Sequence, residues 1–118
     1  MPHILIVDDS SSDRKLLETI VERIGHSFES LDDGMHVLET VIKQRPDLIF
    51  LDIMMEMKEG IQTLYELQDG YADIPVVMVS AAADIYGEQA ISLGAKEALQ
   101  KPLRLDTIKA IIEQYIQD

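Results

Sequence analysis

The chain lacks cysteine entirely among its 118 residues. Disulfides, thiolate metal sites and thiol nucleophiles are therefore excluded. Long apolar runs are also missing, because none approaches the roughly 18 residues that a membrane-spanning helix needs. The opening sequence, MPHILIVDD, shows no signal-peptide pattern. The sequence thus predicts no membrane span.

Positive charge is scarce. Ten Lys and Arg residues stand against 22 Asp and Glu residues, which gives a formal net charge of −12. Such a field repels the phosphates of DNA and RNA, so direct nucleic-acid binding by this domain is not expected. The same field attracts cations and partners with basic surfaces, and it also keeps the protein in solution.

Short apolar runs alternate with helical patterns along the whole sequence, of which 47% is apolar. The length and the absence of a linker predict one domain over residues 1–118. Strands are expected at 3–7, 27–31, 48–52, 76–79 and 98–100, with helices at about 10–24, 34–43, 60–69, 84–93 and 105–116. This alternation predicts an α/β fold, a (βα)5 doubly wound open parallel sheet. The runs alone do not determine the order of the strands.

Local signals refine three of these helices. Ser10 and Asp13 form a capping-box pattern at the start of the first helix, and Gly25 is a natural stop. In the second helix the periodicity assigns Ile42 to the inward stripe. Asp84 is expected to be the N-cap of the fourth helix.

Polar side chains stand where several of the apolar runs end. Asp8 and Asp9 follow the first run, and Asp52, Ser80 and Lys101 follow the third, fourth and fifth. Because parallel strands end at the same edge of a sheet, these side chains should gather there. Three carboxylates, a hydroxyl and an ammonium suit a divalent cation and a phosphoryl group. Taken singly, each of them also has an ordinary explanation as a cap, turn or surface residue.

Together these positions resemble the receiver domain of two-component response regulators. The resemblance covers the whole chain and rests on Asp8-Asp9, Asp52, Ser80-Ala81 and Lys101-Pro102, with Gly60 and Gly94-Ala95. It implies the flavodoxin-like strand order 2-1-3-4-5. It also implies a cytoplasmic signalling switch in a phosphorelay rather than a turnover enzyme.

The resemblance further implies how the site works. Asp52 would take a phosphoryl group from a phosphohistidine on a sensor histidine kinase or a histidine phosphotransfer protein. Mg²⁺ would be held directly by Asp9, partly through water by Asp8, and by Asp52 and the Met54 carbonyl oxygen.

Two further site residues acquire roles in the same way. Lys101 would pair with Asp52 at rest and with a phosphoryl oxygen afterwards. The Ser80 hydroxyl would donate to another phosphoryl oxygen and move toward it. The Lys101-Pro102 bond is expected to be cis. The output partner would bind the face made by the fourth helix, the fifth strand and the fifth helix.

Three positions depart from the family pattern. Glu56 stands where proline is usual, and Lys58 stands where an apolar residue is usual. Ala98 replaces the aromatic residue that transmits the signal in many receivers. We therefore hypothesise that the backbone of residues 81–84, together with Tyr86, carries the movement of Ser80.

Two other functions fit the predicted fold. A flavodoxin-like module that binds FMN or a nucleotide would need a loop rich in N–H donors after the first strand, but this chain has Asp8 and Asp9 there. A phosphatase with an aspartyl nucleophile would need a second acid two residues after Asp52, where this chain has Met54.

Overall fold

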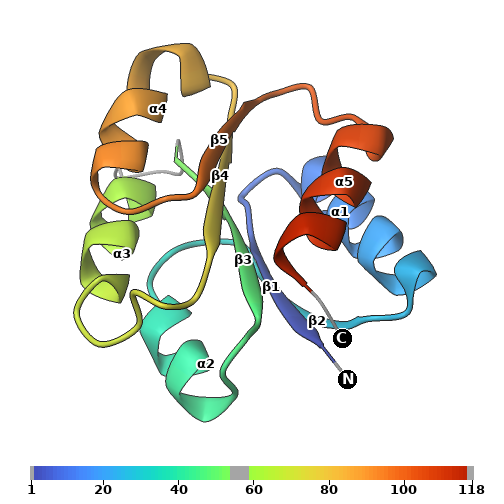
Figure 1. Ribbon diagram of the computed structural model, residues 1–118, viewed down its shortest axis with the longest axis horizontal. Coiled ribbons are helices and arrows are strands. Elements are labelled where there is room, and N and C mark those ends of the chain that lie inside the picture. Colours follow the sequence, from blue (N-terminus) through green and yellow to red (C-terminus); the bar gives the residue numbers. More distant parts are fainter. Residues whose placement is uncertain (1, 54–58, 117–118) are drawn as a thin grey trace.

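Five strands alternate with five helices in the computed structural model, which describes residues 2–53 and 59–116 (Figure 1). The strands are β1 (His3–Val7), β2 (Ser27–Leu31), β3 (Leu48–Asp52), β4 (Val76–Ser80) and β5 (Glu97–Gln100). The helices are α1 (Ser11–Ile24), α2 (Val37–Lys43), α3 (Glu59–Leu67), α4 (Ala83–Ser92) and α5 (Leu105–Tyr115).

All five strands are parallel and lie in the order β2-β1-β3-β4-β5. Both the predicted fold class and the order implied by the resemblance are confirmed. The register pairs Val7 with Leu51 and Asp52 with Val79, so β1, β3 and β4 end side by side. The carboxyl ends of these strands therefore form one edge.

The helices cover both faces of the sheet. In Figure 1, α1 and α5 lie on one side and α2, α3 and α4 on the other. Alternate residues of the strands supply two separate apolar cores, with Phe50 in the core under α1 and α5 and Leu51 in the core under α2, α3 and α4. Burial on both faces explains why β1, β3 and β4 are continuous apolar runs without polar alternation.

The same alternation assigns the polar residues at the strand ends to different faces. Asp8 and Asp52 follow the alternation of Ile6 and Phe50, which point toward α1 and α5. Ser80 follows Met78, which points toward α3 and α4. The carboxylates of Asp8 and Asp52 in the candidate site therefore lie on one side of the sheet, and the hydroxyl of Ser80 lies on the other.

Helix α1 begins as predicted but its capping box is only half made. Ser10 is the N-cap, and its Oγ accepts the Asp13 N–H at 3.4 Å. The reciprocal bond is absent among the described residues, because Asp8 Oδ1 accepts the Ser10 N–H at 2.9 Å. The Asp13 carboxylate points elsewhere. Gly25 ends the helix at φ 101°, a conformation that glycine adopts without a steric cost.

Three expectations for α2 and α4 were wrong. Helix α2 begins at Val37 rather than near residue 34, because Asp33 Oδ1 accepts the Met35 N–H and forms a turn there. Ile42 is 68% exposed, since it lies about 100° around the helix from buried Val41. Helix α4 has Ala82 at its N-cap, and Asp84 lies within its first turn.

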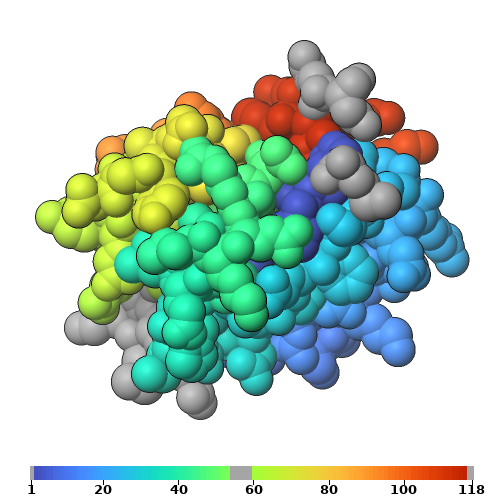
Figure 2. Space-filling view, turned by 90° about the horizontal axis from the view of Figure 1, so that it is seen from below, coloured from blue at the N-terminus to red at the C-terminus, as the bar shows by residue number. Residues whose placement is uncertain are grey.

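Figure 2 shows the other end of the molecule, where α2 and the segments leading into β3 and β4 form the surface. The candidate site lies at the opposite end, where the strands finish. No helix within the described ranges is both long and apolar enough to cross a bilayer.

Candidate functional site

Two buried carboxylates lie at the centre of the carboxyl edge. Asp8 is completely buried after β1, and Asp52 is 2% exposed at the end of β3. The neighbouring register of Val7 and Leu51 brings the two side chains together. Buried carboxylates need hydrogen bonds or opposite charge, and Asp8 receives the Ser10 N–H at 2.9 Å. Arg14 supports the same turn by donating to the Asp8 carbonyl oxygen at 2.7 Å.

Lys101 supplies the opposite charge. Its Nζ donates to Asp8 Oδ1 at 3.2 Å and to Asp52 Oδ2 at 3.3 Å, and it lies 3.0 Å from Asp8 Oδ2. It also lies 2.9 Å from Asp13 Oδ2, which comes from the first turn of α1. The Lys101-Pro102 peptide bond is cis, as predicted.

The charge on Lys101 is secured by these carboxylates. Burial alone would lower the pKa of its ammonium group, but the contacts with Asp13 and Asp8 and the charge of Asp52 raise this pKa above its usual value. Lys101 is therefore a cation at neutral pH. Three carboxylates around one ammonium still leave the described site with a net negative charge.

Asp9 completes a group of acids with the spacing of a cation site. Its side chain is exposed, and one carboxylate oxygen each from Asp8, Asp9 and Asp52 lie within 4.8 Å of one another. A spacing of this size suits oxygen ligands that share one small divalent cation. Asp8, Asp9 and Asp52 are therefore the described residues that would hold such an ion together.

The hydrogen bonding of Asp8 also fits a cation. Within residues 2–53 and 59–116, its buried Oδ2 accepts no hydrogen bond, although Lys101 Nζ lies 3.0 Å away. A buried carboxylate oxygen without a hydrogen-bond donor has coordination capacity left. Hard oxygen ligands of this kind are those that Mg²⁺ prefers. The residues present thus fit the ion that the resemblance implies.

Ser80 ends β4 on the other side of Asp52 and is completely buried. Its Oγ accepts the Ala82 N–H at 2.9 Å, which orders the first residues of the β4–α4 connection. A hydroxyl that accepts a hydrogen bond still carries a proton to donate. The Ser80 hydroxyl can therefore donate a hydrogen bond to an anion bound beside Asp52.

Gly60 shows why this position excludes a side chain. A Cβ atom here would lie 2.1 Å from the Asp52 carbonyl oxygen and 2.7 Å from the Ile53 Cα atom. The start of α3 thus packs directly on the end of β3, so a glycine is required.

The predicted metal ligand Met54 and the departures Glu56 and Lys58 lie outside the described residues.

Sequence reasoning missed two residues of the site. Asp13 was interpreted as part of a capping box, yet its carboxylate pairs with Lys101. Gln100 was given no role, yet its amide Nε2 donates to the Ala81 carbonyl oxygen at 2.6 Å and its Oε1 accepts the Asp84 N–H at 3.0 Å. Neither contact has a sequence signal, because both join segments that are distant in the chain.

This fold and acidic edge define a class of protein, and the comparison with known families agrees. The model of the response regulator receiver domain matches residues 4–113. The chain belongs to this family, whose members are phosphorylation-controlled switches of two-component signalling.

Individual proteins similar to the chain point the same way. A probable transcriptional regulator, ycf27 of Guillardia theta, is 32% identical over 97% of this chain and 45% of its own length. The response regulator MprA of Mycobacterium leprae is 31% identical over 97% of this chain and 50% of its own length. The chain therefore spans about half the length of these relatives.

Two solved structures share the fold over almost their whole length. The receiver domain of NtrX from Brucella abortus superposes with a TM-score of 0.88 at 30% identity, covering 95% of this chain and 96% of that one. The chemotaxis protein CheY4 of Vibrio cholerae gives a TM-score of 0.88 at 25% identity, covering 98% and 99%.

Proposed function

We propose that this receiver domain works in the cytoplasm and, in a Mg²⁺-dependent reaction, accepts a phosphoryl group on Asp52 from a phosphohistidine of a sensor histidine kinase or a histidine phosphotransfer protein. One observation carries the proposal: the Asp52 carboxylate lies within one group of acids and also contacts the Lys101 ammonium at 3.3 Å. Nucleophile, cation ligands and countercharge are thus next to one another. The proposed role is that of a switch set by phosphorylation rather than of an enzyme that turns over substrate.

In the proposed transfer, an Asp52 carboxylate oxygen attacks phosphorus and forms the new O–P bond. The P–N bond to the donor imidazole breaks, and its electron pair stays on the ring nitrogen. The donor leaves as a neutral ring because its other nitrogen carries a proton. The product is an aspartyl-phosphate, and no oxidant or further reactant is needed.

The residues around Asp52 meet the requirements of such a transfer, which are positioning and neutralisation of charge on the phosphoryl oxygens. Asp8, Asp9 and Asp52 would hold Mg²⁺, with the Met54 carbonyl as a further proposed ligand. When bound there, the ion would supply positive charge beside the phosphoryl oxygens. Lys101 would contact another of these oxygens once Asp52 is modified.

Ser80 would convert the modification into movement. Its hydroxyl would turn toward a phosphoryl oxygen and give up the Ala82 N–H that it accepts at rest. The Gln100 side chain ties the same connection to β5 through the Ala81 carbonyl and the Asp84 N–H. These bonds support the hypothesis that the backbone of residues 81–84 passes the signal to α4.

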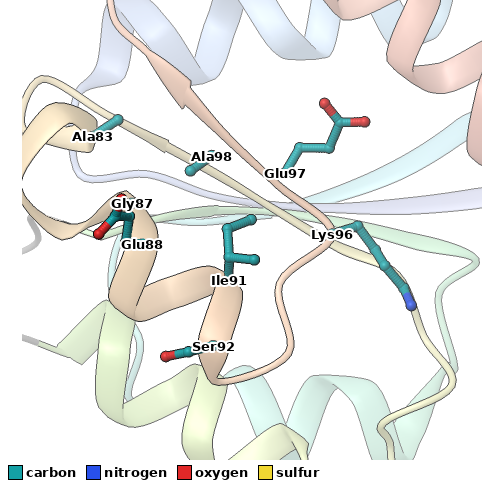
Figure 3. Close-up of a pocket in the computed structure, with 8 residues that line it drawn as sticks. All are labelled: Ala83, Gly87, Glu88, Ile91, Ser92, Lys96, Glu97 and Ala98. Carbon is teal, nitrogen blue, oxygen red and sulfur yellow. The ribbon is translucent and has the colours of Figure 1, made fainter.

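The output face proposed for a partner is the surface of α4, β5 and α5. Figure 3 shows a groove between α4 and β5, with Ile91 rising from the helix and Glu97 projecting away from it. At Gly87 a Cβ atom would lie 3.1 Å from that of Ala98, so the helix rests closely on the strand here. A movement of the start of α4 would therefore change the width of this groove.

Acetyl phosphate with Mg²⁺, followed by intact-mass measurement, tests the proposed function. The wild type should gain the mass of one PO₃ group, and Asp52→Asn should gain none. Asp106→Asn is the matched control, because this carboxylate is exposed in the first turn of α5. Modification of Asp52→Asn, or a wild type that is never modified, would contradict the proposal.

A further inference from the structure

The Asp13 carboxylate is the one partner of Lys101 that the proposed chemistry leaves without a role. It lies 2.9 Å from Lys101 Nζ, closer than either Asp8 or Asp52. It comes from α1, on the side of the sheet toward which Asp8 and Asp52 point. Its backbone N–H stays capped by Ser10, so the cap does not depend on its carboxylate.

A count of donors shows why this contact matters. An ammonium group has three N–H donors, and three carboxylates surround that of Lys101. A phosphoryl oxygen can therefore take a donor only if one of these carboxylates gives it up. Asp52 would give up its contact when it is modified, and Asp8 belongs to the acidic group that would hold the cation. Asp13 lies outside that group among the described residues, so it remains as a competitor for the ammonium.

We infer that Asp13 is a positioning residue that holds Lys101 toward α1 at rest and so weakens the binding of a phosphoryl group on Asp52. The inference rests on the proposed function. Asp13 competes with the phosphoryl oxygens for the ammonium, and its negative charge also repels them. The competition and the repulsion both weaken the binding of the phosphoryl group at Asp52.

Replacement by asparagine separates charge from shape. Asp13→Asn keeps the size of the side chain and the backbone cap but removes the charge from the Lys101 contact. At saturating Mg²⁺, the variant should bind beryllofluoride, a phosphoryl mimic, roughly twofold to fivefold more tightly, the upper part of the range expected for loss of one partly exposed charge pair. Asp106→Asn, which removes one charge from the first turn of α5, should bind the mimic like the wild type.

Backbone amide shifts in a beryllofluoride titration give the affinities, after a separate Mg²⁺ titration has established saturation for each variant. If Asp13→Asn binds beryllofluoride equally well or more weakly than the wild type, the inference is overturned. Weaker binding would mean that Asp13 orients Lys101 toward the phosphoryl group. Tighter binding by Asp106→Asn to the same extent would also overturn the inference, because the effect would then be one of net charge alone.

A second measurement needs neither metal nor mimic. The ζ-ammonium resonance of Lys101, assigned by its loss in Lys101→Arg, should shift and exchange with water faster in Asp13→Asn than in the wild type, and Asp106→Asn should leave it unchanged. An unchanged resonance would overturn the resting contact itself. A wild type with this contact that binds no beryllofluoride would instead refute the proposed function, and the inference would fail with it.

Discussion

Replacing Lys101 by methionine should destabilise the metal-free protein severely. Methionine keeps most of the length of the side chain but removes the cation that contacts Asp8, Asp13 and Asp52. Asp8 and Asp52 are buried, and the Lys101 side chain is only 14% exposed. The variant therefore leaves two buried carboxylates without their countercharge.

The size of the effect follows from this burial. Removing one partner of a buried ion pair costs about 3–5 kcal/mol, and we take about 3 kcal/mol because Lys101 and Asp13 retain some contact with solvent. With an unfolding entropy of about 2.1 cal/mol/K per residue, this loss lowers the Tm of a chain of this length by about 12 °C.

Thermal unfolding followed by circular dichroism, with a chelator and then with Mg²⁺, measures the prediction. Lys109→Met is the matched control, because Lys109 is exposed on α5. Mg²⁺ should raise the Tm of Lys101→Met more than that of the wild type, since the ion supplies the missing positive charge. A Lys101→Met variant as stable as Lys109→Met, or one that gains no more from Mg²⁺ than the wild type, would refute the reasoning.

Three other changes test separate parts of the structure. Gly60→Ala should lower stability by roughly 1–3 kcal/mol, because its Cβ would lie 2.1 Å from the Asp52 carbonyl oxygen; an unchanged urea midpoint would contradict this. Gln100→Ala should speed hydrogen exchange of the Asp84 amide by roughly tenfold, since that amide loses its acceptor, and a rate equal to the wild type would rule out the bond. Burial and the carboxylate of Glu97 raise the pKa of the Tyr115 hydroxyl. The hydroxyl therefore stabilises the folded protein fully below pH 10.0, the ordinary pKa of tyrosine, and this stabilisation is lost as pH rises through the higher pKa of the folded state. Tm measured against pH should therefore fall less steeply in this alkaline range for Tyr115→Phe, and an identical decline would exclude the effect.

The sheet could be predicted largely from the sequence, because β1, β3 and β4 are apolar runs buried on both faces. The gathering of Asp8, Asp52 and Lys101 followed from one rule, that parallel strands end at a common edge. The strand order came only from the resemblance, since apolar runs carry no information about neighbours.

What the sequence did not reveal depends on tertiary contacts. Asp13 satisfies a local capping pattern, and only the approach of Lys101 gives its carboxylate another partner. Gln100 bonds to a connection 16 to 19 residues earlier in the chain, for which no short-range pattern exists. Asp84 is a good N-cap residue in isolation, but the observed helix starts one residue before it. Local propensity is a weak guide where a distant segment supplies the hydrogen bond.

The division of the interior into two cores has a mechanical consequence. Phe50 and Leu51 are neighbours in the chain but pack into different cores, so the sheet separates two blocks of side chains. A ligand that binds Lys101 on one side of the sheet and Ser80 on the other would link these two blocks. Local opening of either helical layer would then strain the other, and the two layers would exchange their amide hydrogens as one unit.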